Sequence, residues 1–450
     1  MAARQLLSTI QKTKVFCYGL NEISKLRSMK HHDHVSSRYF SSKRRSQTEI
    51  LKSALNNYDD LQLAPLQIKN CNIGVSFSEA RLEHELYSCT GNDIVLCESF
   101  SNVFKEGFNA LHQSIDKVGV GFFDSPTVDN IGTEDYMYYQ ALSALRQFLS
   151  EIDYHEKCLK QKEPFGDAFD KQNEAYVATL LTNHLLSRLV YGNRYLISNK
   201  FSVQPPKCPC LKPLECSSLI NCGQTGLGCE DIWYGHPDIV LVPPNFSNIP
   251  LWFFEDDIEA QMQDDDDLST KDLLQENDGS IDISELKLKM VLEKCAEQIL
   301  SQAITFSFYE ANRDSPGGRE RHTLIPSLVL TPHHYLVVMY DYENDILLSS
   351  DHQISPLWDE TGLKFNLSAI LQIWMVLNHS YLKPKLSSVF QKDFAFTCEI
   401  HRIFKELQVF DKTKQITYRP SFRQENKHVK DKKPFMLYSD YKKSFNRCHA

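Results

Sequence analysis

The chain has 450 residues, of which 42% are hydrophobic, 11% aromatic and 24% charged. This composition is that of a globular soluble protein, and the length allows one large domain with extensions or two domains of ordinary size. No apolar run approaches the roughly 20 residues that a membrane-spanning helix needs, so we expect no membrane segment. Thirteen cysteines, an odd number spread over a long chain, favour reduced thiols in an intracellular protein over a disulfide framework.

The net charge of −9 is distributed very unevenly along the chain. Residues 255–282 hold twelve acidic side chains and one lysine, whereas residues 1–45 and 401–450 each have a net charge of +8. Such segregation of charge along the chain indicates that the tails and the insertion have functions separate from that of the core. We expect the acidic insertion, residues 256–279, to be disordered because it repels itself and has few apolar residues.

The basic segment 1–45 leaves two interpretations open. It is rich in Arg, Lys and Ser, and Arg38 stands a few residues before a Ser-Ser pair, as in a mitochondrial presequence. The alternative is a disordered basic tail in which Lys43, Arg44 and Arg45 form a nuclear signal. A secretory signal is not expected, because the segment lacks an apolar core. The predicted location is therefore intracellular, either mitochondrial or nuclear.

Residues 46–165 are predicted to form a mostly helical N-terminal region. The segment that starts at Cys97 has helical spacing, and residues 134–158 show a second helical pattern. One helix face would hold the apolar residues of the first segment: Phe100, Val103, Phe104, Phe108 and Leu111. No catalytic pattern occurs here, so we interpret this region as a helical flank.

Residues 166–400 alternate between helical and strand patterns. In chain order, the pattern predicts a helix over 172–192, a loop over 201–230, a hairpin of 238–242 with 251–255, a helix near 289–310, strands over 324–330, 335–341 and 345–349, and a helix over 366–382. We expect the last two strands to pair as a hairpin because only a short turn separates them. This order predicts an α/β core, a mixed sheet flanked by helices.

Three charged residues in this core have the chemistry of a divalent-metal site. Asp238 follows Pro237 at the start of an apolar strand, and Glu285 and Lys287 are two residues apart. If residues 281–288 form a strand, Glu285 and Lys287 lie on the same face. Carboxylates can hold a metal that polarises a phosphoryl oxygen and activates water. One alternative stays open: residues 284–300 can also begin one long helix with Ser284 as its N-cap, and the pair would then diverge.

A helical segment with two glutamines follows this Glu-x-Lys triplet. Gln298 and Gln302 are four residues apart and therefore lie on one helix face. The order Pro-Asp strand, Glu-x-Lys, glutamine helix resembles the PD-(D/E)XK nuclease superfamily, and the run from Gln298 to Phe308 is similar to a group of invertebrate proteins with that core. Glu174, on the preceding helix, matches a further acidic position found in parts of the superfamily.

This resemblance implies a restriction-endonuclease-like fold over residues 166–400 and cleavage of nucleic-acid phosphodiester bonds. It implies that Asp238 and Glu285 bind Mg²⁺ or Mn²⁺, that Lys287 orients the attacking water, and that Gln298 and Gln302 lie near the site. Nucleic acid is the expected partner, DNA more than RNA. The alternative function is a catalytically inactive nucleic-acid-binding or scaffold protein on the same fold.

Two other features concern ligands. Five cysteines cluster between residues 208 and 229: Cys208, Cys210, Cys216, Cys222 and Cys229. Because no Cys-x2-Cys pair occurs among them, we favour free or redox-labile loop cysteines over a zinc site. The basic tail, residues 401–450, alternates aromatic with basic residues, a mixture that can attract phosphates and stack on bases.

Overall fold

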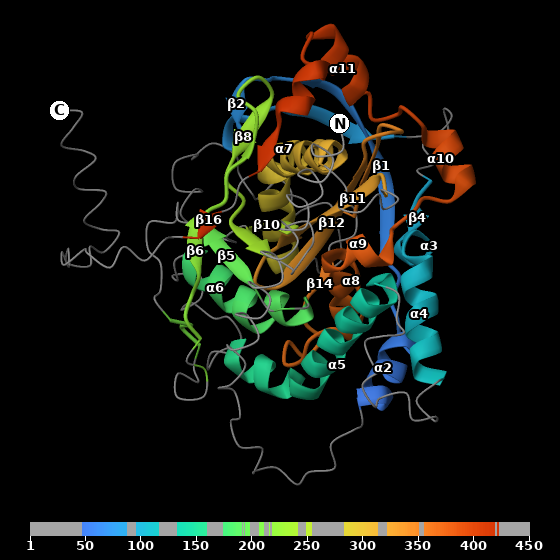
Figure 1. Ribbon diagram of the computed structural model, residues 1–450, viewed down its shortest axis with the longest axis vertical. Helices are drawn as coiled ribbons and strands as arrows, with labels where there is room; N and C mark the ends of the chain where they lie inside the picture. The colour runs from blue at the N-terminus through green and yellow to red at the C-terminus, as the bar shows by residue number, and fades with distance from the viewer. Residues whose placement is uncertain are drawn as a thin grey trace, which may run out of the picture. The chain divides into compact units, whose positions relative to one another are not determined.

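The computed structural model describes most of the chain between Gln47 and Phe422 (Figure 1). The described residues are 47–87, 96–116, 133–159, 174–190, 192, 194–198, 207–210, 216, 218–241, 249–253, 283–313, 322–350, 355–418 and 421–422. All of them belong to one compact unit, Ser46–Ala450. The predicted presequence or tail (1–45), the acidic insertion (256–279) and residues 423–450 lie outside the described part of the chain.

A large mixed sheet forms the centre of this unit (Figure 1). Its strands, in spatial order, are β16 (Ser421–Phe422), β6 (Cys222–Gln224), β5 (Tyr195–Ser198), β9 (Ile239–Leu241), β10 (Ile249–Phe253), β11 (Leu324–Leu330), β12 (His334–Asp341), β13 (Ile346–Ser349), β1 (Gln62–Cys71) and β3 (Leu82–Leu86). Two pairs, β5 with β6 and β10 with β11, are parallel. The α/β class predicted from the sequence is therefore confirmed.

Helices cover both faces of the sheet. One face packs against α2 (Gln47–Asn56), α4 (Lys105–Asp116), α5 (Thr133–Leu159), α6 (Glu174–His184) and α8 (Leu367–Leu377). The other face packs against α7 (Ile283–Asn312) and α11 (Ile400–Glu406). Alternate residues of β12 enter the two hydrophobic cores: Val337 faces the first and Val338 the second. Burial on both faces explains why β11 and β12 are nearly continuous apolar runs.

The last strand before the Pro237-Asp238 segment in the chain belongs to a second, smaller sheet. This sheet consists of β15 (Thr417–Tyr418), β7 (Leu227–Gly228), β8 (Trp233–Gly235) and β2 (Val75–Ser76). Gly235 ends β8 at a place where a Cβ atom would lie 2.5 Å from the Phe77 ring. Glycine at this position therefore allows β8 to pack closely against Phe77 before the chain enters β9.

Short elements complete the described chain. They are β4 (Glu98–Ser99), β14 (Ser355–Pro356), α3 (Phe100–Val103), α9 (His379–Leu382), α10 (Ser388–Phe394) and the 3₁₀ helices η1 (Phe77–Glu79), η4 (Leu186–Leu189) and η5 (Phe410–Gln415).

Several predicted elements are confirmed. The hairpin forms from β9 and β10, and β12 pairs antiparallel with β13. The apolar residues predicted on one helix face around residues 97–111 are all buried. The helix predicted over 172–192 ends earlier than expected, because α6 stops at His184 and the chain continues as η4. The loop predicted over 201–230 is wrong in part, because β6 and β7 lie within it.

Two boundaries differ from the sequence-based prediction. The region 46–165 is not a separate flank, because β1 pairs with β13 and extends the central sheet. The tail predicted to begin at residue 401 takes part in the fold, because β15 pairs with β7 and β16 pairs with β6. In both cases strand pairing joins segments that are far apart in sequence, and local patterns do not reveal such pairing.

Candidate functional site

Asp238 lies directly before β9, as predicted. Its backbone carbonyl accepts a hydrogen bond of 2.8 Å from the Ser198 amide, which joins the start of β9 to the end of β5. Asp238 itself is half-buried, and the preceding Pro237 is buried. The aspartate therefore stands at an end of two neighbouring strands within the central sheet.

The expectation of a strand over 281–288 is wrong, because Ile283 begins the helix α7. Glu285 and Lys287 both lie in the first turns of this helix. Residues two apart on a helix point about 200° away from each other, so these two side chains do not share a face. The alternative of one long helix is the one observed, although α7 begins at Ile283, so Ser284 lies inside the helix and is not its N-cap. The side chains of Glu285 and Lys287 themselves lie outside the described part of the chain.

Gln298 and Gln302 lie on the same helix, four residues apart. Gln298 is half-buried, whereas the Gln302 side chain is only 1% exposed. The Oε1 atom of Gln302 is buried without a hydrogen-bond partner. The packing of α7 against β11 and β12 accounts for this burial. Nothing in the described geometry joins either glutamine to Asp238.

A groove of about 670 Å³ is lined in part by residues that come just before the Pro-Asp segment in the chain. Its lining includes Tyr234 and His236 from the segment before Asp238, and Glu230 and Asp231 from the turn between β7 and β8. Asp231 forms an ion pair with Lys412, at 3.1 Å. This groove is thus an open, polar surface whose lining reaches His236, two residues before Asp238, but does not include Asp238 itself.

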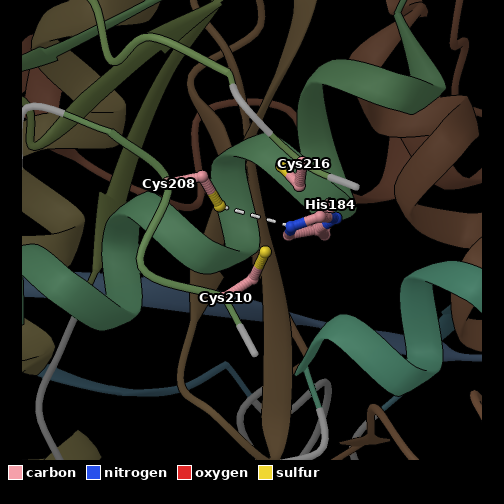
Figure 2. A group of neighbouring side chains, drawn as sticks. All are labelled: His184, Cys208, Cys210 and Cys216. Atoms are coloured by element: carbon pink, nitrogen blue, oxygen red, sulfur yellow. Dashed lines mark hydrogen bonds between the residues drawn. The ribbon is translucent and has the colours of Figure 1, made fainter. Parts of the chain in front are cut away.

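A second group of residues converges elsewhere: three of the clustered cysteines, for which the sequence favoured free thiols over a zinc site, and a histidine that the sequence did not single out. His184, Cys208, Cys210 and Cys216 place one ligand atom each so that all four atoms lie within 4.8 Å of one another. We call these four residues the Cys3His group. Figure 2 shows the four side chains turned toward one another, with His184 at the end of α6 and the cysteines on the following segment. Each residue is at most 6% exposed.

The backbone holds the cysteine segment in place beside α6. An antiparallel bridge joins Lys207 to Leu219, and the Cys208 amide donates to the Ser218 carbonyl at 3.0 Å. These contacts bring Cys208 and Cys216 back to each other across the loop. His184 comes from 24 residues earlier in the chain, and its Nε2 atom lies 3.3 Å from the Cys208 sulfur.

Polar neighbours surround the Cys3His group. Asn183 Nδ2 donates to the Cys216 sulfur at 3.3 Å, and the Ser218 hydroxyl is 3.6 Å from the same sulfur. On the other side, His155 Nδ1 lies 3.3 Å from His184 Nδ1. The Nε2 atom of His155 is 3.7 Å from a carboxylate oxygen of Glu151.

The electrostatics of the group favour one thiolate. A hydrogen bond from the Cys208 thiol lowers the pKa of Cys216 well below its ordinary value and raises the pKa of Cys208. Burial lowers the pKa of His155, so its ring is neutral near pH 7 and able to accept a hydrogen bond from His184. The nearby His155 ring lowers the pKa of Glu151, which keeps that carboxylate ionised.

The Cys3His group has the donor set of a metal site and not that of the predicted Mg²⁺ site. Thiolates and imidazoles suit zinc, whereas Mg²⁺ prefers oxygen ligands. In the part of the chain that the structure describes, this is the one group of three or more such residues close enough to share an ion, and Asp238 is not in it. The sequence signal that could have found it is a histidine closing a helix before a cysteine-rich loop.

No protein-family model, curated protein or solved structure matches the chain. Among the described residues, no helix combines the length and apolar character that crossing a membrane requires.

Proposed function

We propose that the chain acts on nucleic acid through a nuclease-like core and hydrolyses phosphodiester bonds with Mg²⁺ or Mn²⁺, held in part by Asp238. The resemblance at Pro237-Asp238 motivates this function. The observation that supports it best is the connectivity of the elements around that aspartate.

The supporting elements occur in the chain in the order α6, β5, β9, β10, α7, β11, with β6, β7 and β8 inserted between β5 and β9. Strands β5, β9 and β10 form an antiparallel trio, and Pro237-Asp238 opens its middle strand. The helix α7, with its two glutamines, then connects β10 to a parallel neighbour, β11. This retains the order of parts on which the resemblance rests, except that Glu285 and Lys287 lie on the helix.

The chemistry that Asp238 would supply is metal binding. A carboxylate-bound divalent ion stabilises the charge that develops on phosphorus and lowers the pKa of a bound water. Such charge stabilisation amounts to several kcal/mol, so loss of the metal-binding carboxylate should slow cleavage by about 10²-fold or more. The open groove beside His236 offers space for a polymer backbone to approach this end of the strand.

The test is a cleavage assay with the full chain on labelled single-stranded DNA, duplex DNA and RNA, with Mg²⁺, Mn²⁺ or a chelator. We expect metal-dependent cleavage, stronger on DNA, that Asp238→Asn reduces by about 10²-fold or more. Asp393→Asn is the matched control, because Asp393 is an exposed aspartate on α10 and should have no effect. Unchanged cleavage in Asp238→Asn would contradict the role of Asp238.

Variants of α7 test the roles predicted for Glu285 and Lys287. Because the two side chains diverge on the helix, at most one of them can face the same metal as Asp238. We therefore expect that Glu285→Gln and Lys287→Ala do not both abolish cleavage. Loss of cleavage in both folded variants would show that this segment is not helical when the protein is active.

One observation favours a second candidate function, binding without cleavage. The helical placement of Glu285 and Lys287 removes the same-face pair that the nuclease prediction required. In the sequence, Glu255 follows the end of β10 but Asp257 stands where a lysine would complete a Glu-x-Lys pattern, and both lie outside the described residues. Fluorescence anisotropy with the same DNA and RNA distinguishes the two functions: salt-sensitive binding with no cleavage in either metal supports this one. If the protein neither binds nor cleaves these nucleic acids, both proposed functions are contradicted.

A further inference from the structure

We propose that the Cys3His group, His184, Cys208, Cys210 and Cys216, binds one zinc ion whose role is structural. This site is separate from Asp238 and does not depend on the nuclease proposal. It would fasten the C-terminal end of α6 to Cys208, Cys210 and Cys216, which precede strand β6 of the central sheet in the chain.

The spacing of the four ligand atoms matches a tetrahedral zinc ion. Zn–S bonds of about 2.3 Å and Zn–N bonds of about 2.0–2.1 Å place neighbouring ligand atoms of a tetrahedron about 3.6–3.8 Å apart. The ligand atoms here lie within 4.8 Å of one another, and the Cys208 sulfur is 3.3 Å from His184 Nε2. Small rotations of the side chains suffice to close this arrangement around an ion.

The surroundings of His184 fix which nitrogen binds. Its Nδ1 atom is 3.3 Å from His155 Nδ1, so an Nδ1–H of His184 can donate to His155 and leave Nε2 free for the metal. His155 Nε2 in turn faces the Glu151 carboxylate at 3.7 Å. Zinc-binding histidines are commonly oriented by such a partner on the other ring nitrogen, and a carboxylate often ends the chain of contacts.

The surroundings of Cys216 favour a thiolate ligand as well. Its sulfur receives an N–H hydrogen bond from Asn183 at 3.3 Å, and the Ser218 hydroxyl lies 3.6 Å from it. Donors of this kind offset the negative charge of a metal-bound sulfur. The alternative explanation, a set of unrelated buried thiols, gives no reason for a histidine at the centre of the group.

The site is closed, which argues for a structural and not a catalytic ion. Four protein ligands complete a tetrahedral zinc, whereas a catalytic zinc keeps one position for water or substrate. All four residues are at most 6% exposed, so an ion here is shielded from solvent. The ligands span 33 positions in the chain, from His184 to Cys216, so an ion here would join the end of α6 to the three cysteines.

The experiment is metal analysis of the purified full chain, prepared without chelator and under reducing conditions. We expect about one zinc per chain in the wild type, and a loss of at least half of it in Cys208→Ser, Cys210→Ser or His184→Ala. Cys222→Ser and Cys229→Ser are matched controls from the same cysteine-rich segment, since neither residue belongs to the Cys3His group, and both should keep one zinc.

A second measurement keeps the proposal testable if a ligand variant fails to fold. Wild-type protein reconstituted with Co²⁺ should show sulfur-to-cobalt charge-transfer absorption and intense tetrahedral d–d bands, both of which excess zinc removes. Wild-type protein that is folded, reduced and free of zinc even after incubation with zinc would overturn the proposal. So would zinc loss in Cys222→Ser equal to that in Cys210→Ser.

A milder variant tests the positioning role of His155 and Glu151. Glu151→Gln leaves all four ligands in place but weakens the contact that orients His155 and, through it, His184. We expect zinc affinity to fall by about 10-fold, the lower end of the range for such partners, because Glu151 acts through His155. The zinc stoichiometry at saturating zinc should stay at one. A zinc affinity equal to that of the wild type would contradict the proposal that Glu151 orients His184 through His155.

Discussion

Removal of the proposed zinc ion should lower the thermal stability of the folded unit by a predictable amount. A ligand that binds only the folded state stabilises it by RT ln(1 + [L]/Kd), about 4 kcal/mol when free zinc is 1,000 times the dissociation constant. The described part of the chain holds roughly 270 residues, and an unfolding entropy of about 2.1 cal/mol/K per residue gives about 0.6 kcal/mol/K in total. The melting temperature should therefore fall by about 7 °C if these residues unfold cooperatively.

The assay is thermal unfolding followed by circular dichroism, with zinc-loaded protein, protein treated with a zinc-selective chelator, and treated protein resupplied with zinc. The variant Cys210→Ser should melt like the chelated wild type and should not respond to zinc. Cys222→Ser, the matched control, should respond like the wild type. Equal melting temperatures for loaded and verified metal-free protein would refute the reasoning, because an ion that links α6 to the cysteine segment must contribute to their association.

Three further predictions concern the fold. Leu328→Ala on β11, where the side chain is fully buried, should lower the unfolding free energy measured in urea by about 2–5 kcal/mol, and a cost below about 1 kcal/mol would contradict its core position. Gly228→Ala should destabilise far more than Gly362→Ala in the same assay, because a Cβ at Gly228 would lie 2.2 Å from the Trp233 carbonyl oxygen while Gly362 faces open space, although both have positive φ. Burial lowers the pKa of His379 from its ordinary 6.5 to about 4, so the unfolded state takes up the proton first as pH falls below about 6.5. The free energy of unfolding at pH 5 should therefore be about 2 kcal/mol lower than at pH 7.5 because of His379. A folded His379→Gln variant should lose about 2 kcal/mol less than the wild type over the same interval. Equal losses in the two proteins would show that His379 is not buried in its neutral form.

The sequence was sufficient to predict an element where its residue pattern is compatible with only one type of secondary structure. The runs that became β11, β12 and β13 are apolar, short and separated by turn residues, and no helix competes for them. The hairpin of β9 and β10 could be predicted for the same reason. What could not be predicted is that β1 joins the same sheet beside β13, because this pairing links residues nearly 300 positions apart.

The error at Glu285 and Lys287 has a specific cause. The alternation of Ile281, Ile283, Glu285 and Lys287 fits a strand over only four side chains, whereas Glu, Leu, Lys and Met are all strong helix formers. The same residues therefore extend α7 toward its N-terminus. A short period-2 pattern next to a long helical pattern should be assigned to the helix unless a turn residue separates them.

The Cys3His group was missed because its fourth ligand looks like a core residue. His184 falls on the apolar stripe of α6, and the cysteines have irregular spacing without a Cys-x2-Cys pair. Only the fold shows that α6 ends at His184 and that the loop returns Cys208 and Cys216 to it. The ligand set is thus a product of tertiary structure that the linear spacing does not encode.

X-ray absorption at the zinc edge tests the metal site most directly, since it reports the ligands of the bound ion in the intact protein. For zinc-loaded wild type we predict three sulfur neighbours at about 2.3 Å and one nitrogen neighbour at about 2.0–2.1 Å. Cys210→Ser should show one sulfur fewer if it still binds zinc. A shell of oxygen and nitrogen alone, or one of four sulfur atoms without His184, would contradict the site.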